Sequence, residues 1–490
     1  MKIAYFSPLN PIKSGISDFA EELLPFLARN SEIELFVDYF VPSSVDICRD
    51  FVVHDIREYD NPELRETFDT AVFQVGNNYE FHRAIVEAFI NYGGILELHD
   101  LSLHHFIAAE MICQGKIDEY KNLINYCHGR KGLSEAEDYL NGKTDSLWET
   151  RPLEFPVNKH LIDLADAVIV HSDFARQMVL SINSSVPVAV IPLGTVDIVD
   201  DPEAYKSHCR ACLNIAEDRI VFGSFGLATP TKRIIETISA LGKYKCTVNS
   251  NFTYYIVGGV SGIDIETEIY AHSLKDNVIV TGFLELDTFK LYMGACDICI
   301  NLRYPTQGES SAVLHRLMGL GKPVIVTDIG SFAEYPYQVA YKIPYGKEEV
   351  PELLKALTVW TSKAGMMERR AIGAKEYAAK NLSMDIVGKE YECFFEKVTG
   401  GMIEPDLENI YISRLIRAAK GSAETIDTFM QQNHASILRL CGENTAQKKN
   451  KVLPEYLDKK ADQLAEMDFT VGYFDHFADM CSIFAVKSEL

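Results

Sequence analysis

The sequence predicts an α/β protein of two tandem, doubly wound domains with a C-terminal helical extension. Short apolar runs alternate with helical stretches twice along the chain, which is typical of parallel sheets with helices on both faces. A polar segment at 196–218 separates the two sets of runs. After Gly401, apolar residues recur only at helical spacing. The 490 residues also exceed what one core usually holds, so more than one domain is expected.

The first domain is expected at residues 1–196. Its candidate strands are apolar runs at 2–7, 33–40, 70–76, 93–99, 166–172 and 188–193. The second domain is expected at residues 215–382. Its candidate strands are at 220–226, 252–259, 277–283, 297–302 and 323–328. We interpret segment 196–218 as the linker. Ligands of such sheets bind beyond the carboxyl ends of the strands, and two facing domains would enclose a cleft there.

Composition narrows the functional classes. The contents of 47% hydrophobic and 24% charged residues are typical of a soluble globular protein. No apolar run reaches the ~20 residues of a membrane helix, and the N-terminus does not resemble a signal peptide. The net charge of −23 argues against nucleic acid as a partner. Eleven scattered cysteines indicate reduced thiols and a cytoplasmic location.

Two cysteine pairs have the CxxC spacing of zinc ligands, Cys209/Cys212 and Cys296/Cys299. The alternative is that they are buried thiols. Cys296 and Cys299 fall in an apolar run expected to be a strand, where positions three apart face opposite sides. We therefore expect buried thiols and no metal site.

The loop after the candidate strand 297–302 predicts an anion site. The strand ends at Arg303, and Ser310 and Ser311 begin a helix that Gly321 ends. The first amides of a helix lack internal partners and lie at the positive end of its dipole, so they favour a phosphate or diphosphate. Arg303 could add a bidentate contact. The alternative is that Ser310 merely caps the helix.

Other charged residues beside these loops are candidates. Glu309 is either a first-turn carboxylate or a group that holds sugar hydroxyls. Arg316, seven positions later, could contact a ligand, pair with Glu309 or face solvent. Lys232 begins a helix after strand 220–226, where its charge opposes the dipole and a bound anion would compensate. An ordinary surface lysine is the alternative.

The first domain offers a histidine and a glycine. His99 and Asp100 follow strand 93–99 at its carboxyl end. His99 could hydrogen-bond a substrate hydroxyl, or the two residues could form a structural pair. Gly15 lies in the first strand-to-helix loop, which carries neither a GxGxxG nor a Walker A motif.

Together these motifs resemble a known family. “SGISDFAEELLPFL”, “LHD”, “ADAVIVHSDFAR”, “FGLATPTKR”, “VIVTGFLELDTFKLYMGACDICINLR” and “GKPVIVTDIGSFAEYP” follow one another in an order that resembles glycosyltransferase family 4. Its members are retaining enzymes of the two-domain GT-B fold that use nucleotide sugars. The resemblance covers roughly residues 1–398.

The resemblance implies a role for each matching residue. Gly15 would approach the donor diphosphate, Lys232 would bind it, and the Ser310 and Ser311 amides would meet its phosphates. His99 and Glu309 would contact the donor sugar. Phe283 and Leu284 would lie at the nucleobase.

Two positions depart from the family pattern. Leu227 stands where the family has an Arg, whose charge Arg303 could replace. The second Glu of the family's E-x7-E element is absent, and its position falls on Arg316 or Leu317.

The implied activity is metal-independent, retaining transfer of a hexosyl unit from a UDP- or GDP-linked sugar to a glycan, glycolipid or glycoprotein acceptor, with no further cofactor. The acceptor would bind the first domain and the donor the second, and a helix at 383–400 would cross back to the first. Residues 401–490 lie outside the common core and are expected to be a helical cap, oligomer surface or peripheral membrane contact at the inner face. A non-catalytic GT-B partner subunit and a nucleotide-sugar epimerase are the alternatives.

Overall fold

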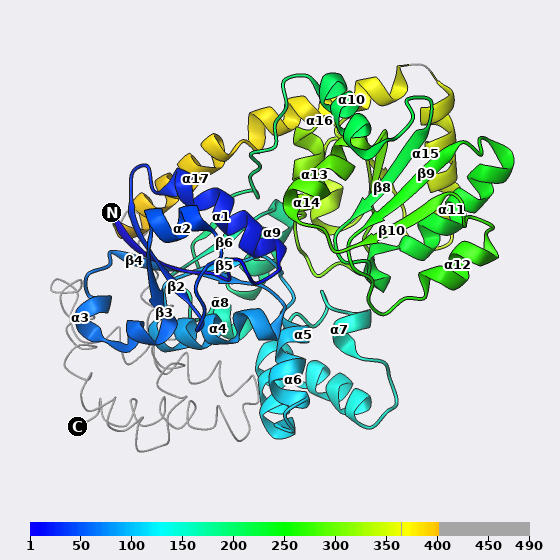
Figure 1. Ribbon diagram of the computed structural model, residues 1–490. Coiled ribbons are helices and arrows are strands. Elements are labelled where there is room, and N and C mark those ends of the chain that lie inside the picture. The colour runs from blue at the N-terminus through cyan, green and yellow to red at the C-terminus, as the bar shows by residue number, and fades with distance from the viewer. Residues whose placement is uncertain (364, 401–490) are drawn as a thin grey trace, which may run out of the picture.

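The computed structural model describes residues 1–363 and 365–400 and contains two parallel sheets in tandem (Figure 1). This confirms the predicted α/β fold of two doubly wound domains. The predicted helical extension at 401–490 lies outside the described residues. Within the described part of the chain, no helix combines the length and apolar character needed to cross a bilayer.

The first sheet has seven parallel strands in the order β3-β2-β1-β4-β5-β6-β7. They are β1 (Lys2–Phe6), β2 (Glu32–Val37), β3 (Val52–Asp55), β4 (Thr70–Val75), β5 (Ile95–Leu98), β6 (Ala167–Val170) and β7 (Val188–Val190). The order reverses between β1 and β4, which is where ligands bind in doubly wound sheets.

Helices cover both faces of this sheet. They are α1 (Gly15–Leu27), α2 (Val45–Asp50), α3 (Pro62–Arg65), α4 (Tyr79–Tyr92), α5 (His104–Ile107), α6 (Ile117–Leu140), α7 (Leu147–Thr150), α8 (Lys159–Ile162) and α9 (Asp173–Ile182), with helical turns at Ile56–Asp60 and Ala108–Ile112. One core packs Phe89 of α4 and Ile124 of α6 against Phe73 of β4. The other packs Leu23 of α1 against Tyr5 of β1.

The second sheet has six parallel strands in the order β10-β9-β8-β11-β12-β13. They are β8 (Ile220–Phe225), β9 (Phe252–Val257), β10 (Val278–Gly282), β11 (Ile298–Asn301), β12 (Val324–Thr327) and β13 (Ala340–Ile343). Its helices are α10 (Pro202–Leu213), α11 (Ile234–Thr247), α12 (Ile265–Ala271), α13 (Leu286–Ala295), α14 (Ala312–Gly319), α15 (Glu349–Ser362) and α16 (Met366–Asn381), with turns at Pro230–Lys232 and Gly330–Glu334. The order reverses between β8 and β11.

The linker interpretation of 196–218 is wrong over α10. Asp201 caps this helix by accepting from the Glu203 and Ala204 amides, and Pro202 suits its first turn. Arg210 is buried and pairs with Asp297 at 2.6 Å. Most of the segment is therefore a helix packed on the second domain.

The cysteines of the two CxxC pairs are free thiols. Cys209, Cys296 and Cys299 are buried, as expected, whereas Cys212 is exposed. The expectation of a buried thiol is therefore wrong for Cys212, which lies on the outer side of α10 while Cys209 lies on the packed side.

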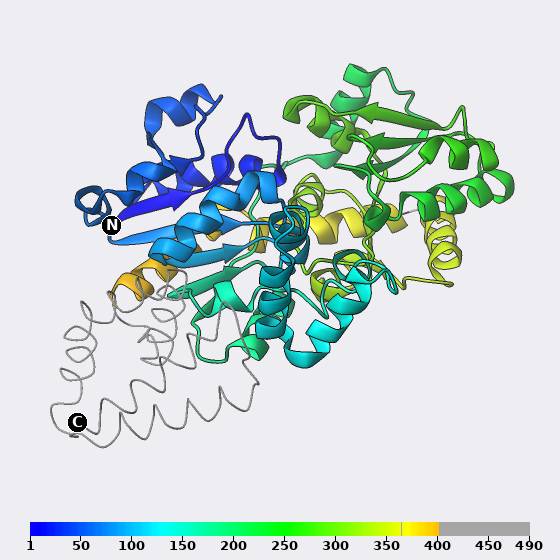
Figure 2. The ribbon, with the colours of Figure 1, turned by 90° about the horizontal axis from the view of Figure 1, so that it is seen from below.

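The chain crosses back to the first domain through α17 (Met384–Thr399), which α16 precedes (Figures 1 and 2). Tyr391 and Phe395 of α17 belong to the core that also contains Leu23 of α1. The Tyr391 hydroxyl donates to Glu97 Oε1 at 2.5 Å, and the Asn30 side-chain amide donates to Glu392 at 3.0 Å. The first domain is thus completed by a helix from the end of the described chain.

Candidate functional site

The loop between β11 and α14 reaches directly into the first domain. The Ser102 amide donates to the Gln307 carbonyl at 2.8 Å, and the Gln307 side chain donates to the Trp148 carbonyl at 3.3 Å. Gly308 has φ of 80°, and a Cβ there would lie 2.6 Å from Leu101 Cβ. The carboxyl ends of the two sheets are therefore in contact at this loop.

A charged cluster lies on the same loop. Arg303 Nε is 2.8 Å from Glu309 Oε1, and both side chains are mostly buried. The other carboxylate oxygen of Glu309 accepts from the Thr306 hydroxyl and the Gln307 amide, each at 2.7 Å. Glu309 therefore orients both Arg303 and the backbone of the loop that contacts the first domain.

Lys232 lies beside this pair, on the turn after β8. Its Nζ donates to the Phe225 carbonyl at 2.6 Å, and within the described residues Lys232 forms no ion pair. Burial, reinforced by the nearby Arg303 charge, holds the pKa of Lys232 well below its usual range, while Glu309 opposes this effect. An ammonium group in this position would be stabilised by an added anion.

Asp100 brings a second carboxylate from the first domain. Its Oδ2 accepts from the Asn77 amide at 2.8 Å. Burial and the charge of Glu309 raise the pKa of Asp100 to about 7, against the lowering effects of the Asn77 hydrogen bond and Arg303. In the sequence, Asp100 could be found by its position at the carboxyl end of a strand. The same observation made His99 a candidate.

Gly15 lies near this edge of the sheet. A Cβ on Gly76 would lie 2.6 Å from Ile16 and 3.4 Å from Asp100 Oδ2, so the Gly15 loop approaches the carboxyl ends of β4 and β5. A Cβ on Gly15 itself would meet no atom of the described residues within 4 Å. The space beside Gly15 is therefore open.

His99 contacts Gln74 through its Nε2 atom and is 8% exposed. Its ring lies 4.6 Å from that of His171, centroid to centroid. Asp100 instead accepts from Asn77, so the alternative of a structural His99–Asp100 pair is wrong.

The start of α14 has a cap and a contact between domains. Ser311 has extended backbone geometry, and its Oγ accepts from the Leu314 amide at 3.2 Å, which makes Ser311 the capping residue. Ser310 Oγ donates to the His171 carbonyl at 3.1 Å. The helix therefore begins at Ala312, directly after Ser311 and beside the first domain, and the alternative that Ser310 caps it is wrong.

Arg316 does not pair with Glu309, because Glu309 precedes α14, the helix that carries Arg316. The guanidinium of Arg316 pairs with Glu22 of α1 at 2.8 Å and also with Asp197. Lys290 lies 2.9 Å from Asp197 and 3.7 Å from Glu22. These four charged residues form a largely buried network that joins the domains, and the alternatives that Arg316 pairs with Glu309 or faces solvent are wrong.

Phe283 and Leu284 follow β10. Phe283 is 54% exposed, and Lys13 Nζ of the first domain lies 3.9 Å from its ring centroid. Leu284 packs at the margin of the second domain's core. An exposed aromatic face thus lies between the Lys13 loop and the second sheet.

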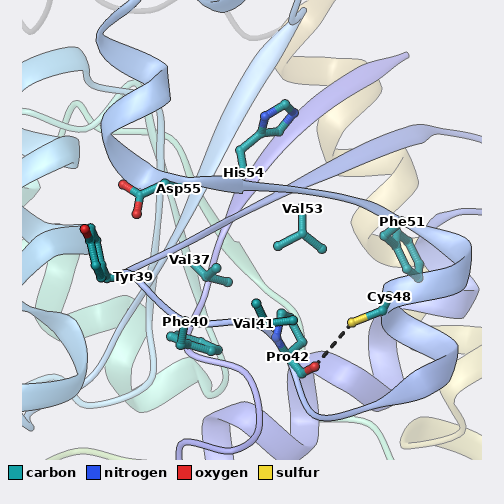
Figure 3. A pocket seen from close by; sticks show the side chains of 10 residues that line it. All are labelled: Val37, Tyr39, Phe40, Val41, Pro42, Cys48, Phe51, Val53, His54 and Asp55. Carbon is teal, nitrogen blue, oxygen red and sulfur yellow. Dashed lines mark hydrogen bonds between the residues drawn. The ribbon is translucent and has the colours of Figure 1, made fainter.

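A cavity of 590 Å³ occurs elsewhere, at the outer edge of the first sheet (Figure 3). Residues of β2, β3 and α2 line it, with Phe40, Phe51 and Val53 among its apolar walls. Its lining includes none of the predicted site residues. The cavity is therefore separate from the charged cluster at the domain junction.

Comparison with solved structures identifies the fold as GT-B. Sucrose-phosphate synthase from Thermosynechococcus elongatus matches with a TM-score of 0.60 and 14% identity over 82% of this chain and 100% of the other. Anabaena Alr3699/HepE in complex with UDP and glucose matches with a TM-score of 0.56 and 17% identity, over 81% of this chain and 100% of the other. WaaG, a glycosyltransferase involved in lipopolysaccharide biosynthesis, matches with a TM-score of 0.52 and 16% identity, over 81% of this chain and 100% of the other.

The second domain carries a family signature of its own. Residues 207–337 match the profile of the family described as Glycosyl transferases group 1, and this region includes Lys232, Arg303 and Glu309. No curated protein matches the chain. The resemblance to GT-B glycosyltransferases is therefore confirmed for the fold and for this region.

Proposed function

We propose that the protein is a glycosyltransferase that moves a sugar from a nucleotide donor to an acceptor at the domain junction. One observation carries the proposal: the Lys232 side chain lies beside Arg303 without an ion pair among the described residues, and its pKa is lowered by burial. A diphosphate would supply the missing negative charge. The family match over residues 207–337 supports the proposal, and one solved neighbour holds UDP and glucose.

The proposed chemistry is electrostatic. As the bond between sugar and phosphate breaks, charge develops on the leaving diphosphate. Lys232 and Arg303, together with the Ser310 and Ser311 amides, would stabilise that charge. Gly15 leaves room for the phosphates, because nothing lies within 4 Å of its missing side chain. In this arrangement protein cations perform the role that a metal ion performs elsewhere, so we propose a metal-independent transfer.

Donor recognition would use residues from both domains. Glu309, held by Thr306 and Gln307, would accept hydrogen bonds from sugar hydroxyls. His99 would contact the sugar from the first domain through Nδ1, because its Nε2 contacts Gln74. Phe283 and Leu284 would lie against the base of a UDP- or GDP-linked donor. Retention of configuration and a glycan, lipid-linked or protein-linked acceptor are proposed from the family resemblance.

One observation favours a second candidate, a non-catalytic GT-B partner subunit. Arg316 occupies, within one residue, the position of the family's second carboxylate, and it is tied to Glu22 and Asp197. A donor ribose would then lack the usual acceptor, so a subunit that no longer binds donor is the rival to the enzyme.

Slow hydrolysis of a nucleotide-sugar panel tests the proposal. The wild-type protein is expected to release nucleoside diphosphate from one donor, and Lys232→Met to lose about 10²–10³ in rate. Lys245→Met is the matched control, because Lys245 is a partly exposed residue of α11 that donates to the Ser273 carbonyl, away from the junction. No turnover of any donor, with or without candidate acceptors, would favour the non-catalytic subunit.

A further inference from the structure

A buried polar cluster lies beneath the carboxyl ends of β5 and β6. Glu97 is on β5, His99 follows it, and His171 follows β6. His99 Nε2 is 3.6 Å and His171 Nε2 is 3.7 Å from Glu97 Oε1, and one ligating atom from each residue lies within 4.8 Å of the others. All three residues are buried, and Phe19 of α1 packs against both imidazole rings.

The hydrogen bonds leave two polar atoms of this cluster without partners among the described residues. His171 Nδ1 donates to the Ile191 carbonyl at 2.8 Å, because a carbonyl oxygen can only accept. The Nε2 atom of His171 therefore carries a lone pair, and it is buried without a hydrogen-bond partner in the described part of the chain. Glu97 Oε2 is likewise buried and has no hydrogen-bond partner among residues 1–363 and 365–400, while Oε1 accepts from the Tyr391 hydroxyl.

A carboxylate in this position needs a positive charge or a proton. Glu97 is 0% exposed, and the described residues place no lysine or arginine in an ion pair with it. Burying an unpaired charge is costly. A bound cation would satisfy the carboxylate and the imidazole lone pair together.

We propose that Glu97, His99 and His171 form a binding site for a divalent transition-metal ion of the zinc type. Two imidazoles and one carboxylate are a ligand set that Zn²⁺ accepts, with bonds of about 2.0–2.2 Å. Ligand atoms of a tetrahedral site with such bonds lie about 3.3–3.5 Å apart. The 3.6 and 3.7 Å separations from Glu97 Oε1 require only small shifts, and the ligand atoms of the two histidines, which lie within 4.8 Å of each other, would move closer together. Imidazole nitrogens favour zinc over magnesium or calcium.

Neighbouring groups hold the proposed ligands in position by hydrogen bonds. The Ile191 carbonyl holds the His171 ring with Nε2 toward the cluster, and Tyr391 orients Glu97. His99 Nε2 carries the hydrogen of its contact with the Gln74 amide oxygen, so the ring would take the Nδ1–H tautomer when Nε2 binds the ion. The Gln74 amide oxygen or a water would complete the set. Because Tyr391 comes from α17, the ion would connect β5 and β6 to the helix that returns from the second domain.

The site is structural and shares His99 with the proposed donor site, whereas Lys232 and Arg303, which act at the leaving diphosphate, take no part in it. Metal analysis of tag-free, full-length protein from zinc-supplemented medium is expected to find about one zinc per chain. After chelation, titration with Co²⁺ alone should give the strong visible absorption of a tetrahedral complex and raise the unfolding temperature. Zinc should then displace the cobalt.

His171→Asn and Glu97→Gln are expected to weaken Co²⁺ binding at least tenfold. His272→Asn is the matched control, because His272 lies 3.7 Å from Glu268 on a partly exposed helix end, as His171 lies 3.7 Å from Glu97. Equal cobalt binding by folded His171→Asn would overturn the proposal. So would wild-type protein that holds no zinc and shows only weak octahedral cobalt absorption, a result that does not depend on any variant folding.

Discussion

Glu309 binds Arg303 through one carboxylate oxygen, 2.8 Å from Nε, and holds its own loop through the other. Lys232, the neighbouring cation, donates to the Phe225 carbonyl. The loop that carries Arg303 and Glu309 also contacts the first domain through Gln307. Charge at the junction and contact between the domains therefore depend on the same few residues.

Glu309→Gln is expected to lower turnover about 10²–10³-fold with little change in nucleoside diphosphate affinity. The amide keeps one oxygen for Thr306 and Gln307 but loses the charge proposed to orient the sugar, while Arg303 remains available to the phosphates. Steady-state kinetics and a binding titration measure the two effects separately. Glu203→Gln, at an exposed position on α10, is the control. Unchanged turnover would remove Glu309 from the proposed site.

Nucleoside diphosphate binding is expected to take up a proton at Lys232. The pKa of Lys232 is lowered in the free protein, and a bound anion would raise it again. Affinity should therefore fall as pH rises through the lowered pKa. Titration calorimetry in buffers of different ionisation enthalpy measures the uptake. A wild-type binding heat that is independent of the buffer would contradict the prediction.

Arg316→Met is expected to destabilise the protein by about 3 kcal/mol, because it leaves Glu22 and Asp197 buried with only Lys290 as a counter-charge. Urea unfolding measures the loss. A second change, Glu22→Gln in the Arg316→Met background, should recover part of it. Arg49→Met removes two exposed ion pairs, with Asp46 and Asp50, and should change stability very little. Equal effects of Arg316→Met and Arg49→Met would show that the network is not a stabilising link.

Gly308→Ala is expected to cost about 2 kcal/mol or more of stability, because φ is 80° and the new Cβ would lie 2.6 Å from Leu101 of the other domain. Gly115→Ala provides the comparison. Gly115 has a similar φ of 76°, but no atom of the described chain lies within 4 Å of a Cβ added there, so its cost should be the backbone strain alone, about 1–2 kcal/mol. Thermal unfolding of both variants gives the difference. Equal losses would mean that the approach of the two domains is not tight at Gly308.

The sequence predicted most of the fold because buried parallel strands are continuous apolar runs. β3 and β13 were not predicted. Both are edge strands of four residues, and β3 is only partly buried, so neither forms such a run. The interpretation of 196–218 as a linker was wrong because a polar helix surface resembles a loop in composition, and only the packing of Cys209 and Arg210 distinguishes it.

The candidate site was predicted in part. Lys232, Arg303 and Glu309 lie close together because each follows β8 or β11, the two strands at which the order of the second sheet reverses. Their positions just after apolar runs in the sequence were enough to predict this. The partners of Arg316 could not be predicted, because Glu22 is 294 positions away and the contact depends on how the two domains meet. Residue roles toward a donor stay predictions.

Calorimetric titration of the wild-type protein with UDP, GDP and ADP tests the central claim most directly. We expect saturable binding of at least one of them, loss of that binding in Lys232→Met, and retention in Lys245→Met. Absence of binding to all three, or full binding by Lys232→Met, would contradict a donor site at the domain junction.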